Sequence, residues 1–209
     1  MFKFNRYFVV LLLFLTSQLQ AGKYNKIISI GDHLPEFSQL PSVSGDMLSS
    51  KDLAEDVVVL VLLANHCPWV RGMDQDLIKL VDQFKDKSVR VVGFSVNHRD
   101  DDRLDAMKMH AKKVGYNFTY LYDDSQNLGR QLGATRTPEY YVFDKNRKLA
   151  YMGLLYNSPA KMNADDSIRH INGEVTDNYV ADAIIALLNG SLPTITETRA
   201  HGCSAKYEN

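Results

Sequence analysis

The sequence is poor in several features that decide the class of a protein. It has two cysteines and one tryptophan in 209 residues, and its 24 basic side chains are balanced by 25 acidic ones. A nucleic-acid-binding domain would need a basic stripe, which this chain lacks, so we expect no nucleic acid among its partners. Beyond the first 15 residues no run is apolar enough to cross a membrane. A chain of this length also buries enough apolar surface to fold without disulfides, unlike a small secreted scaffold.

The first 21 residues have the pattern of a secretory signal peptide. Lys3 and Arg6 precede an apolar run over 7–15, and Ala21 stands at a suitable cleavage point. The run is too short to span a bilayer, and an uncleaved anchor is the alternative. Because residues 1–21 carry two basic and no acidic side chains, cleavage leaves 188 residues and changes the formal charge from −1 to −3. We expect a secreted protein, most simply of a bacterial periplasm, without membrane contact after cleavage; a eukaryotic secretory route is the other option.

Apolar runs and helical periodicity alternate along residues 28–190, which we take as one domain. Strands are predicted over 57–63, 88–97 and 118–124, helices over 70–84, 98–116, 125–133 and 174–190, and a hairpin over 139–155. This alternation predicts an α/β fold with a parallel sheet core and helices on both faces, extended by antiparallel strands. We expect a loop over 156–173 and a C-terminal tail over 191–209.

Cys67 stands where the first predicted strand ends and the first predicted helix begins. The carboxyl ends of parallel strands form the ligand crevice of such sheets. A helix N-terminus stabilises a thiolate through its dipole and its free N–H groups, and Pro68 suits the first helical turn. We interpret Cys67, flanked by Asn65 and His66, as a nucleophile. The alternative is an inert core cysteine, although Cys67 lies beyond the apolar run.

A second motif, "GATRTPEYYVFD", places Pro138 at the first residue of a predicted strand, where proline is tolerated. We expect a cis Thr137–Pro138 peptide bond beside the thiol; an ordinary loop proline is the alternative.

The two cysteines and two neighbouring histidines allow further interpretations. Cys67 and Cys203 of an exported protein can form a static disulfide. With His66 and His201 they could hold Cu(I) or Zn, but a loop with two cysteines is missing. We therefore expect no metal and no cofactor, and keep a copper-binding carrier as an alternative.

Several stretches together resemble the thioredoxin superfamily, specifically its peroxiredoxin-like branch (alkyl hydroperoxide reductase / thiol-specific antioxidant, redoxin type). They are "ANHCPWV", "YLYDDSQNLGRQLGATRTPEYYVFDKNRKLAYMG" and "HGCSAKY", and the resemblance covers about residues 30 to 207. It implies a thioredoxin-like fold, with a central mixed sheet flanked by helices, an N-terminal extension and a C-terminal tail.

The chain departs from the pattern of that branch at two positions. Its usual motif resembles Cys-Asn-His-Cys-Pro, so Ala64 replaces the first cysteine, and Arg136 replaces a cysteine common before the Thr-Pro pair. The resemblance implies that Cys67 attacks the substrate and that Cys203, on a tail able to swing over the crevice, acts as the resolving thiol. It also implies that Pro138 shapes the crevice. We expect Arg136 to stabilise the thiolate, and a surface arginine without a role is the equal alternative.

These observations predict an exported thiol-dependent oxidoreductase that reduces peroxides or protein disulfides. Its partners would be an external thiol reductant or a disulfide-bearing protein, with peroxide as the small-molecule substrate. True peroxiredoxins resemble Pro-x-x-x-Thr-x-x-Cys, and here Leu60 and Ala64 occupy the proline and threonine positions. A redox-inert binding module of the same fold is the principal alternative.

Overall fold

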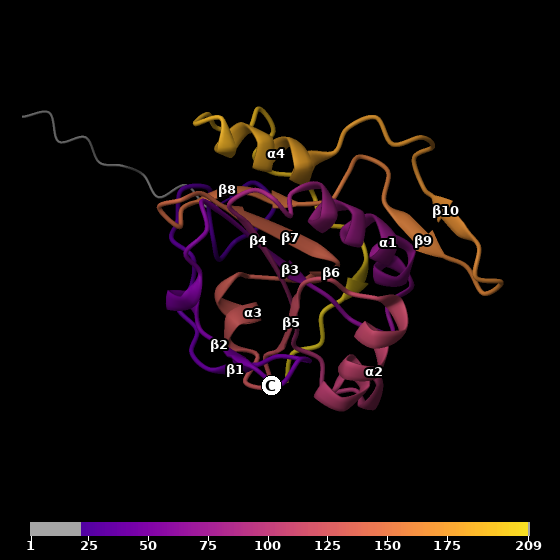
Figure 1. The fold of residues 1–209 in the computed structure, drawn as a ribbon. Helices are drawn as coiled ribbons and strands as arrows, with labels where there is room; N and C mark the ends of the chain where they lie inside the picture. The colour runs from indigo at the N-terminus through magenta and orange to yellow at the C-terminus, as the bar shows by residue number, and fades with distance from the viewer. Residues whose placement is uncertain (1–21, 209) are drawn as a thin grey trace, which may run out of the picture.

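A five-stranded mixed sheet forms the centre of the computed structural model, which describes residues 22–208 (Figure 1). The strand order is β5-β4-β3-β7-β8, with β3 (Val57–Leu62), β4 (Val89–Ser95), β5 (Thr119–Tyr122), β7 (Glu139–Phe143) and β8 (Leu149–Gly153). The first three strands are parallel, whereas β7 pairs antiparallel with both β3 and β8. The predicted α/β fold with a central mixed sheet is therefore confirmed.

The central strand β3 separates two apolar layers, because successive side chains of a strand point to opposite faces. Val57, Val59 and Val61 pack in one layer, and Val58, Leu60 and Leu62 pack in the other. Side chains of α1 (Pro68–Gln83), α2 (Leu104–Val114) and α4 (Tyr179–Leu188) join the first layer. The second layer includes α3 (Asn127–Gln131) and part of the N-terminal segment. All six β3 residues are fully buried, as the continuous aliphatic run predicts.

Short elements complete the N-terminal half. They are the pair β1 (Leu40–Pro41) and β2 (Met47–Leu48) and the 3-10 turns η1 (Ser50–Asp52) and η2 (Asp100–Asp102). The helix predicted from residue 98 begins only at Leu104, since the acidic run forms η2 instead. Asp102 is completely buried there.

Two segments predicted without regular structure contain strands. The expected loop over 156–173 includes a hairpin of β9 (Ala160–Met162) and β10 (Ile168–His170), which lies beside α1 (Figure 1). The C-terminal tail is docked in this structure, because β11 (Cys203–Ser204) pairs antiparallel with β6 (Arg136–Thr137). Both additions were missed because strands of two or three residues are too short to show a periodic pattern.

The N-terminal entry is fixed to the domain by Asn25, whose side-chain amide donates to Leu132 O at 2.8 Å. The expected signal peptide, residues 1–21, lies outside the described residues. Within the described part, no helix combines the length and apolar character needed to span a bilayer.

Candidate active site

Cys67 is the N-cap of α1, at the carboxyl end of β3, and Pro68 is the first helical residue. The turn that precedes it is closed by a hydrogen bond from Cys67 N to Ala64 O at 3.0 Å. The thiol has no exposed surface, and its Sγ donates to Thr137 O at 3.2 Å. The predicted strand–Cys–helix arrangement is confirmed, with the thiol at the positive end of a 16-residue helix.

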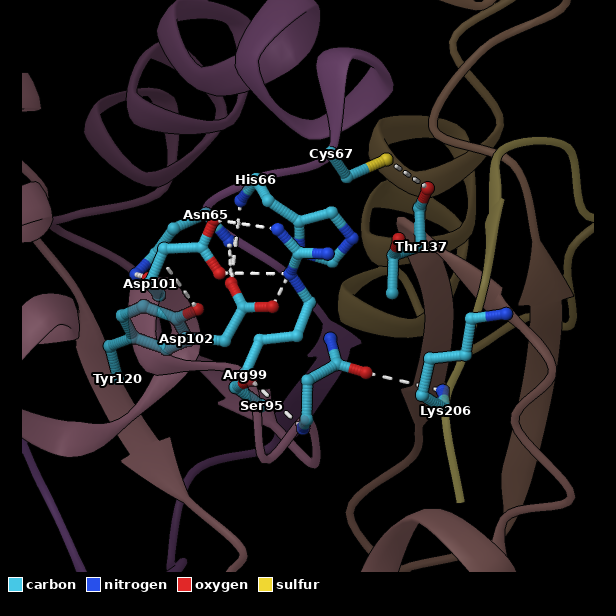
Figure 2. Close-up of polar contacts among 11 residues, drawn as sticks. Asn65, His66, Cys67, Ser95, Arg99, Asp101, Asp102, Tyr120, Thr137 and Lys206 are labelled. Carbon is cyan, nitrogen blue, oxygen red and sulfur yellow. Dashed lines mark hydrogen bonds and ion pairs between the residues drawn. The ribbon is translucent and has the colours of Figure 1, made fainter. Parts of the chain in front are cut away.

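A buried carboxylate holds the backbone on the N-terminal side of Cys67. Asp102 Oδ1 accepts from the backbone N–H of Asn65 at 2.6 Å and of His66 at 3.3 Å, and Oδ2 lies 2.5 Å from His66 Nδ1 (Figure 2). Asn65 also donates to Asp101 O at 2.7 Å and accepts from Tyr120 at 3.2 Å. Asn65 and His66 thus turn toward Asp102, whereas Cys67 points toward Thr137.

The opposite wall of the site is the segment before β7. The Thr137–Pro138 peptide bond is cis, and both residues are buried. Glu139 accepts the backbone N–H groups of Thr135 at 2.9 Å and Arg136 at 3.1 Å, which fixes this turn. Burial raises the pKa of the Glu139 carboxyl, and these two hydrogen bonds oppose the rise. The carbonyl of Thr137 is therefore presented to Cys67 by a segment anchored on both sides.

Arg136 does not share the burial of its neighbour. Its side chain is exposed, and Nη1 donates to Ser204 Oγ at 2.7 Å. Because successive strand residues face opposite ways, Arg136 and Thr137 point to different sides of β6. The predicted effect of Arg136 on the thiolate stays a prediction. In the structure this side chain contacts Ser204 of the tail.

Cys203 lies opposite Thr137 in the β6–β11 ladder, so the site contains both cysteines although 136 positions separate them. Gly202 permits this approach: a Cβ at that position would lie 2.0 Å from Thr137 O, and its φ of +153° disfavours other residues. Farther along, Ala205 N donates to Thr135 O and Tyr207 Oη donates to Ala134 O. The tail is therefore docked along the segment that faces Cys67.

The two cysteines are free thiols that influence each other. The pKa of Cys203 is raised to about 12, first by burial and then by hydrogen bonding to Cys67 and by the charge of Cys67. The positive charge of Lys161 and the backbone N–H of Trp69 act in the opposite direction. Cys203 is consequently protonated at neutral pH while Cys67 is reduced.

The histidines do not gather around the thiols. Across residues 22–208 one group of three metal-type donors converges, His66, Asp101 and Asp102, and it contains neither cysteine. His201 instead packs edge-on against Trp69, with ring centroids 4.4 Å apart. The donor set considered for a copper-binding carrier is therefore not assembled in the described structure.

A model of the Redoxin family matches residues 29–168, about two thirds of the chain and the whole segment from the entry region through β9. This chain belongs to the Redoxin family. The matched segment of this redoxin contains Cys67, Thr137 and Pro138, whereas Cys203 and the docked tail lie beyond that segment. No curated protein matches the sequence.

Solved structures agree with this assignment. An uncharacterized conserved protein from Geobacillus kaustophilus is 28% identical with a TM-score of 0.77, and the alignment covers 88% of this redoxin and 95% of that chain. A putative thiol:disulfide interchange protein DsbE from Chlorobium tepidum is 26% identical with a TM-score of 0.53, covering 60% and 84%. The thioredoxin domain of a thiol-disulfide oxidoreductase from Bacteroides vulgatus, 20% identical with a TM-score of 0.53, covers 61% and 89% and shows the fold alone. The redoxin thus has the thioredoxin-like fold that the resemblance implies.

Four contributors to the site could not be identified by sequence reasoning. Asp102 is one of three consecutive aspartates, and nothing in that run distinguishes the buried one. Trp69 and Lys161 approach Cys203 only through tertiary packing, and Gly202 acts through its close contact with Thr137. The Cys-Pro pair and the Thr-Pro pair, by contrast, carry local signals of a helix start and a strand start.

Proposed function

We propose that this redoxin is a thiol-dependent oxidoreductase in which Cys67 is the attacking nucleophile and Cys203 is the resolving thiol. The observation that carries the proposal is the meeting of both thiols at Thr137: Cys67 donates to its carbonyl, and Cys203 is its partner in the ladder. Two free thiols within interaction distance can pass two electrons to a substrate and become one disulfide.

Reduction of a substrate disulfide would proceed in two thiol–disulfide exchanges. The Cys67 thiolate attacks one sulfur of a substrate disulfide, forms a mixed disulfide and releases the first substrate thiolate. Cys203 loses its proton to solvent and attacks Cys67 Sγ, which breaks the mixed disulfide and releases the second substrate thiolate. The Cys67–Cys203 disulfide then holds the oxidising equivalents until an external thiol reductant restores both thiols.

We infer that protein or small-molecule disulfides are the preferred substrates, and that peroxide is the second candidate. The same pair can reduce a hydroperoxide, because Cys67 would become a sulfenic acid that Cys203 converts to a disulfide with release of water. The side chains that would orient a peroxide do not favour this route: position 64 is a buried alanine, and Arg136 is exposed and bonded to Ser204.

Access to Cys67 requires movement of the docked tail. The thiol has no exposed surface while β11 is paired with β6. We propose that release of residues 202–208 opens the site and that their return delivers Cys203 to the oxidised Cys67. The tail thus acts as a cover in the resting state and as a reactant in the second step.

A competition between oxidants tests the function. Equal low concentrations of oxidised glutathione, a disulfide-containing protein such as insulin and hydrogen peroxide are each added to the reduced chain, and oxidation of Cys67 is followed by mass spectrometry. We expect at least one disulfide to oxidise Cys67 faster than peroxide, with a Cys203→Ser chain trapped as the mixed disulfide. Faster oxidation by peroxide would show that peroxide, and not a disulfide, is the preferred substrate. The proposed function would be overturned if none of the three oxidants oxidises Cys67.

We further propose export, on the basis of the N-terminal sequence. A basic segment followed by a short apolar run and Ala21 supports cleavage before Gly22 and residence in a bacterial periplasm. The mass of the chain purified from an expressing bacterium tests this, because we expect residues 22–209 alone in the periplasmic fraction. An intact chain in the cytoplasmic fraction would contradict export.

A further inference from the structure

The hairpin β9–β10 brings a cation to the beginning of α1. Gly72 allows the contact, since a Cβ there would lie 2.7 Å from Ala160 O and 2.8 Å from Lys161 Cα. Lys161 extends from this hairpin and holds Nζ 5.7 Å from the ring centroid of Trp69, the second residue of α1. No acidic side chain among residues 22–208 lies within ion-pair distance of Lys161. The hairpin therefore places an unpaired positive charge against the wall of the thiol site.

Trp69 connects this charge to the tail. Its backbone N–H lowers the pKa of Cys203, and one edge of its ring contacts His201. The titratable or charged side chains around Cys203 are Cys67 at the start of α1, Lys161 on β9, His201 on the tail itself and Arg136 on β6. Arg136 bonds the neutral hydroxyl of Ser204, and Lys161 is the cation whose charge lowers the pKa of the Cys203 thiol.

We propose that Lys161 is a positioning residue for the resolving step, which favours the thiolate of Cys203 once Cys67 has been oxidised. This inference rests on the proposed function. It assigns a role in the reaction to the hairpin, whose sequence carries no recognisable catalytic motif.

The balance of charges at Cys203 changes with the redox state of Cys67. In the reduced pair, burial and Cys67 raise the pKa of Cys203 and keep it protonated, so Cys203 does not compete for the substrate. A mixed disulfide or sulfenic acid at Cys67 carries neither the thiolate charge nor its hydrogen bond. The ammonium group of Lys161 and the N–H of Trp69 remain, and both favour the negatively charged sulfur. The resolving thiolate is thereby formed after the first step rather than before it.

A coloured disulfide separates the two steps in the full chain. One equivalent of 5,5′-dithiobis(2-nitrobenzoic acid) releases one thionitrobenzoate when Cys67 attacks and a second when Cys203 resolves the mixed disulfide. The variants are Lys161→Met, which keeps an unbranched side chain against Trp69, and Lys161→Arg, which keeps the charge. Thermal unfolding of each variant checks that the fold is retained, and peptide mapping checks which disulfide is formed.

We expect Lys161→Met to slow the second release by about 3-fold to 10-fold at neutral pH, because a smaller thiolate fraction is partly offset by the greater nucleophilicity of a more basic thiol. Its pH midpoint should move upward, the first release should change less than about twofold, and Lys161→Arg should match the parent chain. An unchanged second release in Lys161→Met, or equal slowing in Lys161→Arg, would overturn the role of the charge. A parent chain without any second release would instead overturn the resolving function of Cys203, and with it this inference.

Discussion

Cys67 and Cys203 both lie next to Thr137, yet different kinds of structure hold them. The backbone before Cys67 is tied to a completely buried carboxylate that serves three hydrogen bonds. Cys203 belongs to a two-residue strand and to a tail whose contacts are largely at the surface. The thiol proposed to attack is therefore fixed, whereas the thiol proposed to resolve is attached by interactions that can be released.

The tail contacts are numerous but individually weak. Lys206 N donates to Asn97 Oδ1 at 3.2 Å, and Gln126 contacts Lys206 O at 2.9 Å and Glu208 N at 2.8 Å. Each such bond contributes about 0.5–1.5 kcal/mol, and exposed ones lie at the low end. Loss of a buried charge partner costs about 3–5 kcal/mol. The tail is therefore the part of the site expected to open first.

The largest effect on disulfide reduction is expected when either thiol is replaced by a hydroxyl. Cys67→Ser is expected to abolish disulfide reduction, because a serine hydroxyl does not form the nucleophilic anion near neutral pH. Cys203→Ser should retain the first attack and accumulate the mixed disulfide, since only the second step is lost. Steady-state assays with an external thiol reductant, together with intact-mass measurements, distinguish the two variants. Equal trapping of substrate by both would show that Cys67 is not the attacking group.

The next largest effect is expected at Asp102, which holds the backbone before Cys67. Asp102→Ala should lower the free energy of unfolding by about 3 kcal/mol, because the backbone donors of Asn65 and His66 lose their buried acceptor. Asp101→Ala is the matched control: the neighbouring carboxylate is exposed and pairs with Arg99 at the surface, so we expect a change below about 1 kcal/mol. Urea unfolding measures both, and similar losses would refute the distinct role of Asp102.

In the C-terminal tail that carries Cys203, Gly202→Ala should release the tail from β6. The new Cβ cannot coexist with Thr137 O, and strain at a glycine-type backbone conformation costs about 1–3 kcal/mol. We expect about 10-fold faster alkylation of Cys67, with faster amide exchange at residues 203–208. The slower formation of the internal disulfide should accompany it. Gly173→Ala, at another positive φ but with no atom near its Cβ, is the control for glycine strain alone. An equally buried Cys67 in Gly202→Ala would show that the tail does not cover the site.

The smallest expected effect is a pH dependence of tail docking. His98 lies 2.6 Å from Glu208 and 2.9 Å from Asp124 O, and the hydrogen bond to Glu208 is the main reason that the pKa of His98 is raised. A raised pKa in the docked state means that the contribution is complete below about pH 6.5 and is lost as the pH rises through the raised value. Amide exchange of residues 204–208, corrected for its intrinsic pH dependence, should show about threefold weaker protection at pH 8 than at pH 6. His98→Asn should flatten this difference; a parent chain with pH-independent protection would contradict the role of His98.

The sequence predicted those parts of the molecule whose signals are local. The aliphatic run of β3 indicates a strand buried on both faces, and Cys67-Pro68 marks the helix start. The Thr-Pro pair marks the beginning of β7 and the anticipated cis peptide bond. The parts that were missed depend on contacts between distant residues: pairing of a two-residue β11 with β6, packing of β9 on α1, and burial of one aspartate among three. Periodicity carries no information about such pairings.

The residue that replaces the first motif cysteine illustrates the same limit. Ala64 is fully buried, and its carbonyl accepts the N–H of Cys67. Local structure at this position therefore gives no sign of a second thiol. Without a local partner, the proposed reaction needs a distant group to complete it. The structure supplies a candidate in Cys203, which no spacing rule connects to Cys67.

Peptide mapping of the oxidised chain tests the central claim most directly. The reduced full-length protein is treated with one equivalent of a disulfide, free thiols are alkylated, and the digest is analysed without reduction. The account predicts a peptide pair joined by Cys67 and Cys203, with a loss of about 2 Da relative to the two thiol peptides. A Cys67 that remains in a mixed disulfide or becomes overoxidised while Cys203 is alkylated in full would contradict it.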